Sequence, residues 1–235
     1  MLNLPSSTLV NLKVPKKNFY EKLRLNERVK RLFAAQIESI VWKHKLSRDT
    51  IRLEPKGDIE EIQVFEMHLK QPECSEEVLR CIDQAIPYPI VHVLMYKEQA
   101  KLVIAYKKRN AKDENRAVVF DYYGSPWMNV EDLSSIQLVK GWDLREVYEN
   151  FIRRWLTIKS IPDEPLEVLL DRLSKIERFR KECEQLQAKI LRERQSHRKV
   201  ELNLELQRKQ KLLQNLLGPQ QGEGDDNEEA HYEVG

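Results

Sequence analysis

The chain has 235 residues, 41% of them hydrophobic and 33% charged, with a formal net charge of +2. This length suits one domain with an appendage, and the charged share exceeds the roughly 25% of typical globular chains, which indicates long solvated helices. Three cysteines are too few for a disulfide framework, and no run approaches the ~20 apolar residues that span a bilayer, so the composition excludes a disulfide scaffold and a membrane protein and predicts a cytoplasmic one.

The first 45 residues predict an extended segment followed by helices. Residues 10–14 alternate between apolar and polar side chains, which is typical of a strand. Pro15 stands where it favours the start of a helix. Asn26 is a suitable N-cap, and the apolar residues after it recur at helical spacing. We therefore expect a helix from Asn26 to about His44.

The middle of the chain predicts strands around a helix. Residues 59–70 and 117–123 are rich in strand-forming side chains, and residues 75–86 have a helical apolar face after a serine N-cap. Residues 88–96 and 101–107 are two β-rich runs joined by a short loop, which predicts a hairpin.

A further helix is predicted over residues 142–155, where Trp142 and Trp155 lie among apolar residues and are expected to pack in the core. A strand–helix–strand unit followed by antiparallel strands makes a mixed sheet. The sequence thus predicts an α+β domain over residues 1–160, with a mixed four-stranded sheet and helices packed on it.

Residues 163–217 predict paired helices. An apolar seam at intervals of 3, 4, 3 and 4 residues is typical of a coiled coil, and the polar stretch 192–199 interrupts it. The next stretch, SHRKVELNLEL (196–206), alternates like a strand inside this helical region. Two arrangements stay open: an antiparallel hairpin that turns near residues 195–198, or a long helix that pairs with another chain. Residues 218–235 predict an acidic, disordered tail.

Either arrangement makes the C-terminal helices the strongest candidate for contact with a protein partner or with a second copy. The candidate partner-binding residues are Ile176, Phe179, Leu186, Ile190, Val200 and Leu204.

A cluster of cations near the N-terminus is a candidate nucleic-acid-binding region. Its members are Lys13, Lys16, Lys17, Lys22, Arg24, Arg28, Lys30 and Arg31. Such clustering supplies the phosphate-neutralising part of DNA binding without reading sequence. A solvated helix face gives the same pattern, so both interpretations stay open.

The sequence contains no motif that specifies a reaction. Its glycines cannot build a phosphate-binding loop of the Gly-x-x-x-x-Gly-Lys or Gly-x-Gly-x-x-Gly type, and we expect no cofactor. The scattered histidines and cysteines lack the paired spacing of a metal site, so none is expected. Asp121, on an apolar strand, is the most unusual acid, and together with Glu66, Lys70 and Lys107 it could form a metal-dependent nuclease site. A structural role for Asp121 is the competing interpretation.

Several stretches together resemble one family of uncharacterised bacterial proteins, the domain of unknown function 4391 family. They are LPSSTLVNLKVPK (4–16), IVWKHKLSRDTIRL (40–53), IEEIQVFEMHLK (59–70), IDQAIPYPI (82–90) and RKVELNLEL (198–206). The resemblance implies a mixed α/β domain followed by a helical C-terminus. Genes of such proteins often lie beside those of DNA methyltransferases and helicases.

The resemblance therefore implies a non-catalytic accessory protein of a bacterial DNA-modification, restriction or phage-defence system, with a helicase or a DNA methyltransferase as partner. The alternative from the residues alone is a metal-dependent nuclease that uses the region of Asp121 and Glu66.

Overall fold

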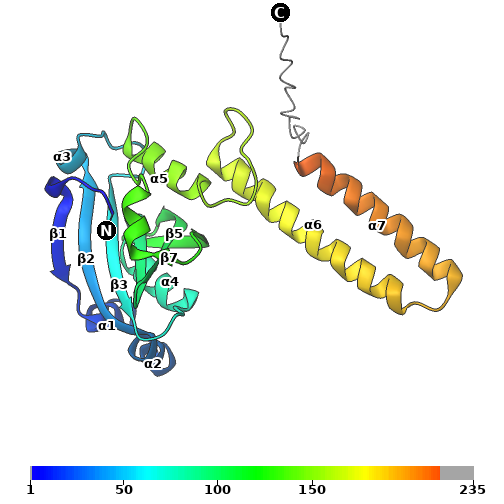
Figure 1. Ribbon diagram of the computed structural model, residues 1–235, viewed down its shortest axis with the longest axis horizontal. Coiled ribbons are helices and arrows are strands. Elements are labelled where there is room, and N and C mark those ends of the chain that lie inside the picture. The colour runs from blue at the N-terminus through cyan, green and yellow to red at the C-terminus, as the bar shows by residue number, and fades with distance from the viewer. Residues whose placement is uncertain (1, 218–235) are drawn as a thin grey trace, which may run out of the picture. The chain divides into compact units, whose positions relative to one another are not determined.

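The computed structural model describes residues 2–217 of the chain. It divides between Leu156 and Thr157 into two units. The sheet unit, up to Leu156, holds a seven-stranded mixed sheet with helices packed on it, and the hairpin unit, from Thr157, holds two helices packed on each other (Figure 1). The predicted α+β class is confirmed, although the sheet has seven strands and not four.

The strands follow their order in the chain across the sheet. They are β1 (Leu9–Lys13), β2 (Ile37–Ser47), β3 (Glu61–Leu69), β4 (Ile90–Tyr96), β5 (Gln99–Asn110), β6 (Asp113–Gly124) and β7 (Met128–Asn129), the last beside β5. Strands β3 and β4 run parallel because α4 (Glu76–Ala85) connects them as a crossover, and the other pairs are antiparallel. The predicted strand–helix–strand unit and the β4–β5 hairpin are both confirmed.

The remaining helices of the sheet unit are η1 (Ser6–Thr8), α1 (Lys16–Leu23), α2 (Glu27–Gln36), α3 (Arg48–Ile51), η2 (Val130–Ser135) and α5 (Leu144–Arg153). Two of them, α2 and α5, begin at a residue whose side chain caps the helix. Asn26 caps α2 as predicted, since its side chain accepts the backbone N–H of Val29 at 3.0 Å. Asp143 caps α5 in the same way through the N–H of Glu146, at 2.8 Å.

The predicted helix from Asn26 to His44 is wrong in its second half. Helix α2 ends at Gln36, and the chain continues directly as β2. The apolar spacing carries on from Phe33 to Ile37 and Ile40, all of which are buried, so the periodicity does not mark the change. Strand β2 has partners on both sides, β1 and β3, and this ladder decides the conformation of a segment rich in β-branched and aromatic residues.

Both faces of the sheet are buried over its centre. On one face, α1, α2 and α4 contribute to a core that includes Phe33, Met67 and Ile82. On the other face, Tyr148 of α5 packs near Ile62 and Ile104. Each large side chain removed from water contributes on the order of 1.5–3 kcal/mol. The two-sided burial explains why β4, at the centre of the sheet, is a nearly continuous apolar run.

Trp142 does not join this core. Its side chain is 89% exposed, so the expected core packing is wrong for this residue, whereas Trp155 is half-buried and packs edge-on against Phe151. The difference follows from position, because Trp142 precedes the N-cap Asp143 and lies outside the helical face that α5 turns to the sheet.

The hairpin unit consists of α6 (Leu166–Arg192) and α7 (Ser196–Leu217), joined by a turn at residues 193–195 (Figure 1). Of the two predicted arrangements, the structure shows the antiparallel hairpin. Helix α6 buries a seam that includes Leu173, Ile176 and Leu186, while α7 contributes half-buried side chains, Leu202 and Leu206 among them. At 1.5 Å per residue, α6 is about 40 Å long. The predicted acidic tail lies outside the described residues.

Candidate functional site

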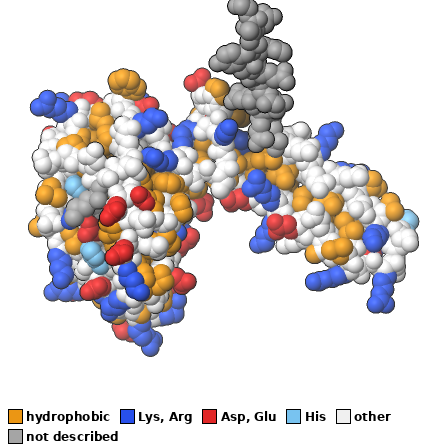
Figure 2. All heavy atoms as spheres, viewed as in Figure 1, with side chains coloured by type: hydrophobic (Ala, Val, Ile, Leu, Met, Phe, Trp, Pro, Cys, Tyr) orange, Lys and Arg blue, Asp and Glu red, His pale blue; other side chains and the backbone are white. Residues whose placement is uncertain are grey.

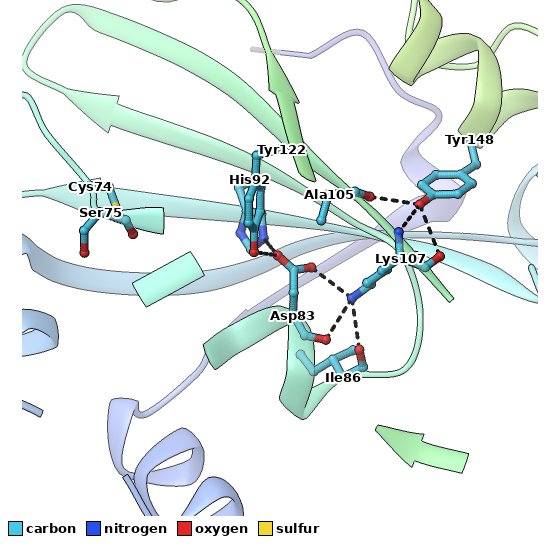
Figure 3. Close-up of polar contacts among 9 residues, drawn as sticks. All are labelled: Cys74, Ser75, Asp83, Ile86, His92, Ala105, Lys107, Tyr122 and Tyr148. Atoms are coloured by element: carbon cyan, nitrogen blue, oxygen red, sulfur yellow. Dashed lines mark hydrogen bonds and ion pairs between the residues drawn. The ribbon is translucent and has the colours of Figure 1, made fainter. Parts of the chain in front are cut away.

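A polar network lies buried between α4 and the sheet (Figure 3). Asp83 of α4 turns its carboxylate toward three strands. Its Oδ2 accepts hydrogen bonds from His92 Nε2 and from the hydroxyl of Tyr122, both at 2.8 Å. Its Oδ1 accepts one from the Nζ of Lys107 at 2.9 Å. One carboxylate thus ties α4 to β4, β5 and β6.

Lys107 has a hydrogen-bond partner for each of its three ammonium protons. Besides the carboxylate, its Nζ donates to the backbone carbonyls of Asp83 at 3.1 Å and Ile86 at 3.0 Å. These carbonyls lie at the C-terminal end of α4, where helix carbonyls lack partners in the helix and the helix dipole favours a cation. The ammonium therefore caps α4 as well as pairing with Asp83.

Next to this network, Tyr148 of α5 bonds to backbone groups of β5 where the β5–β6 ladder is interrupted. The register of β5 against β6 shifts between Ala105 and Lys107. The Tyr148 hydroxyl accepts the backbone N–H of Lys107 and donates to the carbonyl of Ala105, each at 2.9 Å. A bulge interrupts the ladder locally, and one buried hydroxyl restores the hydrogen bonds of two backbone groups.

The network consists of an ion pair, Asp83 with Lys107, and further hydrogen-bond donors around it. Burial alone would raise the pKa of Asp83, but Lys107 and His92 outweigh it and hold this pKa well below its usual range. Burial lowers the pKa of Lys107 against the attraction of Asp83. Burial also raises the pKa of Tyr122 and of Tyr148, so both hydroxyls stay protonated and donate.

The network is sealed from solvent. Asp83 and His92 are 0% exposed and Lys107 is 2% exposed. Tyr122 borders a surface hollow of about 160 Å³, which Cys74 and Lys101 also line. The Nε2 of His92 is bonded to the carboxylate of Asp83, and its Nδ1 is buried without a hydrogen-bond partner among the described residues. Because no described opening leads to the carboxylate, the arrangement is a structural brace between helix and sheet.

The four predicted nuclease residues are not assembled. Asp121 is exposed on β6, whereas Glu66 of β3 contacts Lys43 at 3.6 Å and His68 at 2.8 Å. Lys70 is exposed and donates to the carbonyl of Ala34 at 2.7 Å. Between residues 2 and 217, no hydrogen bond or ion pair joins any two of Asp121, Glu66, Lys70 and Lys107.

Metal ligation finds no support in the described part of the chain, which contains no group of three or more His, Cys, Asp or Glu side chains placed to hold an ion. The cysteines are also poor ligands where they lie. Burial raises the pKa of the Cys74 thiol to about 12, and burial with the nearby Glu77 raises that of Cys81. Both stay protonated at neutral pH, whereas a metal binds the thiolate.

The eight cations near the N-terminus divide into two sets. Lys16 donates to the carbonyl of Ile37 at 2.7 Å, Arg28 pairs with Glu77, and Lys30 pairs with Glu27 at 2.7 Å. The exposed cations without a described acidic partner are Lys13, Lys17, Lys22, Arg24 and Arg31. Figure 2 shows basic side chains at the lower end of the sheet unit, the region of α1 and α2 in Figure 1. DNA binding by this region stays a prediction.

The six predicted partner-binding residues also divide. Ile176 and Leu186 are buried in the seam of the hairpin, with Phe179 and Ile190 half-buried there. Val200 and Leu204 are exposed on α7. Only these last two present apolar surface to a partner.

Fold and site together define a mixed-sheet α+β protein with a sealed polar brace and a helical hairpin. The chain belongs to the family described as Domain of unknown function (DUF4391), whose model matches residues 2–213. The resemblance drawn from the sequence is thereby confirmed. No curated protein and no solved structure matches the chain. Among the helices of residues 2–217, none combines the length and the apolar character needed to cross a membrane.

Proposed function

We propose that this chain is a non-catalytic interaction protein that docks a partner protein on the outer face of α7. The observation that carries the proposal is the distribution of apolar side chains on this helix. In the described chain α7 has no fully buried residue, and Val200, Leu204 and Leu212 are 59%, 50% and 49% exposed. These residues stand at intervals of four and eight, so they share one row on the helix surface.

That row faces away from α6. Leu202, Leu206 and Leu213, half-buried against α6, lie on the opposite side of α7 because a two-residue offset is about 200° on a helix. Arg208 falls within the outer row, and the exposed Lys211 lies beside it. An apolar row with cations in and beside it fits an amphipathic partner helix that carries an apolar stripe and acidic flanks.

The family resemblance supplies the class of partner. It implies a DNA methyltransferase or a helicase of a bacterial DNA-modification, restriction or phage-defence system, and the proposal adopts that class. The outer face of α7 supports docking of a protein, and it carries no preference between the two enzymes.

The proposal is tested by purifying the full-length protein from its native cell and comparing it with Leu204→Glu. A methyltransferase or helicase subunit is expected with the native chain and is expected to be lost from Leu204→Glu, because a carboxylate replaces apolar surface beside an acidic partner. The matched control is Gln210→Glu, which places the same charge at an exposed position of α7 about 120° around the helix from Leu204 and keeps the apolar row. If neither enzyme accompanies the native chain, or if both variants retain it, the proposal is wrong. A concentration-dependent dimer that Leu204→Glu abolishes would assign the face to a second copy instead.

The alternative, a metal-dependent nuclease, has less support because its candidate residues are dispersed over the sheet unit. Its test is Asp121→Ala, which must abolish any divalent-metal-dependent cleavage of DNA that the purified chain shows. Cleavage that survives this substitution removes Asp121 from the mechanism.

A further inference from the structure

The tip of the hairpin carries a concentration of positive charge. Residues 189–199 include Glu193 as their single acid, and the cations among them are Lys189, Arg192, Arg194, Arg198 and Lys199. They belong to the last turn of α6, the connecting turn and the first turn of α7, so the hairpin brings them together at one end. All five are exposed.

Several cations elsewhere in the hairpin unit are paired with acids. Lys175 contacts Asp171 at 2.7 Å, and Lys209 contacts Glu182 at 2.6 Å across the two helices. Arg172 pairs with Glu164 at 2.7 Å. Each of these three basic residues therefore has an acidic partner within the hairpin unit.

At the tip, most of the cations lack an acidic partner among the described residues. The carboxylate of Glu193 accepts the backbone N–H groups of Arg194 at 2.8 Å and Gln195 at 2.9 Å, and it lies 3.6 Å from Arg198. Within residues 2–217, no acid pairs with the side chains of Lys189, Arg192, Arg194 or Lys199. The charge at the tip is thus available to an external anion.

The cations of α7 also stand at the unfavourable end of their helix. Arg198 and Lys199 occupy the first turn, which contains no acid, where the helix dipole favours negative charge. Placing cations there opposes helix stability. Charges that oppose the stability of their own helix are expected at functional sites.

We propose that the hairpin tip binds the phosphate backbone of nucleic acid without reading its sequence. Arginine side chains match phosphate oxygens in geometry and charge, and clustered cations release counterions from the duplex. The hairpin tip presents mainly basic side chains, which contact phosphates and do not distinguish one base from another. Among residues 189–199, Leu191 is a large apolar side chain that is 84% exposed, whereas Ile190 is half-buried in the seam. One exposed residue gives too little apolar area to anchor the tip in a membrane. This site is separate from the docking row of α7 and does not depend on it.

The test uses the full-length chain and a fluorescently labelled 20-base-pair duplex, with fluorescence anisotropy recorded at several salt concentrations. The tip variant is Arg194→Gln/Lys199→Gln. Its matched control is Arg180→Gln/Lys181→Gln, which removes one arginine and one lysine from exposed positions on α6 away from the tip. Circular dichroism confirms that both variants keep their helix content.

Affinity of the native chain is expected to fall steeply with salt. The slope of log K against log salt is negative, and each lost phosphate contact makes it less negative by about 0.9. The slope of the tip variant should therefore be less negative by about 1.8, and its affinity at moderate salt at least about tenfold lower. The control should match the native chain.

Several results would overturn the inference: no duplex binding by the native chain at low salt, or equal losses in both variants. Binding that persists in the tip variant and disappears in Lys17→Gln/Lys22→Gln would move the site to the basic N-terminal region. Binding to vesicles containing phosphatidylserine, without binding to the duplex, would show that the anion recognised is a lipid headgroup.

Discussion

The ammonium of Lys107 lies 2.9 Å from the carboxylate of Asp83, and neither side chain is more than 1% exposed. A buried ion pair is favourable only when its remaining hydrogen-bonding groups also have partners. Here the carboxylate has His92 and Tyr122, and the ammonium has two backbone carbonyls. The pair therefore specifies how α4 sits on the sheet, and removing one member leaves the other charged and buried.

Replacing Lys107 with methionine is expected to destabilise the protein by about 3–5 kcal/mol, because the Asp83 carboxylate then loses its counter-charge. The measurement is the free energy of unfolding in urea. Lys112→Met, which removes an exposed lysine from the β5–β6 turn, should change that energy by no more than about 0.5 kcal/mol. Equal effects from the two substitutions would contradict the role given to the pair.

The same pair predicts loss of stability in acid. The pKa of Asp83 is held below its usual range in the folded state, so below the ordinary value of about 3.9 the unfolded chain binds a proton that the folded chain does not. This contribution is fully present above that pH and declines as the pH falls below it. In the double variant Asp83→Asn/Lys107→Met, the free energy of unfolding should fall less steeply in this range, by up to about 1.4 kcal/mol per pH unit. Unchanged acid sensitivity in the double variant would rule out Asp83 as its source.

Tyr148→Phe tests the repair of the bulge in β5. Losing the hydroxyl leaves the N–H of Lys107 and the carbonyl of Ala105 buried without partners, at about 1–3 kcal/mol each. We expect a total loss of about 2–4 kcal/mol in thermal or urea unfolding. Tyr88→Phe, whose ring is half-buried, is the control and should be nearly neutral. A neutral Tyr148→Phe would mean that water or a shifted ladder satisfies both backbone groups.

The periodicity of apolar residues predicted most helices and strands, but it failed where a helical pattern and a strand pattern coincide. The apolar positions from Val29 to Ile40 fit one helix, yet β2 begins at Ile37, because strand pairing on both sides is a non-local contact that spacing cannot express. The opposite confusion arises in SHRKVELNLEL, which alternates like a strand and is helical. Its alternation is two pairs of residues at four-residue spacing, Leu202 with Leu206 toward α6 and Val200 with Leu204 away from it.

The buried network was only partly visible in the sequence. The sequence-based hypothesis includes Lys107 but groups it with Asp121, which the structure leaves exposed. Asp83 and His92 lie within otherwise apolar segments, and such polar residues, if buried, require partners. That rule could have marked all three residues. Asp83 contacts His92 and Lys107 because α4 crosses over β4 and β5. That placement follows from the topology of the fold, which the spacing of residues in the sequence does not reveal.

Arg172 closes the open end of the hairpin, and its replacement should act locally. Its guanidinium donates to both carboxylate oxygens of Glu164 at 2.7 and 2.8 Å, to the carbonyl of Lys159 at 2.9 Å and to that of Leu216 at 3.1 Å. In Arg172→Met the last turn of α7 loses a partner for a carbonyl that has none within the helix. We expect about 1.5–3 kcal/mol of destabilisation, as for hydrogen bonds to a charged group.

Hydrogen exchange locates this effect. Amides of residues 210–217 and 157–165 should exchange faster in Arg172→Met, while those near the turn at 193–195 should exchange at the native rate, since nothing there contacts Arg172. The control is Lys175→Met, which removes an exposed pair with Asp171 on the same helix and should cost at most about 0.5 kcal/mol. Faster exchange spread evenly over both helices would show that Arg172 supports the hairpin as a whole, and unchanged exchange would show that its four hydrogen bonds contribute nothing to closing the base.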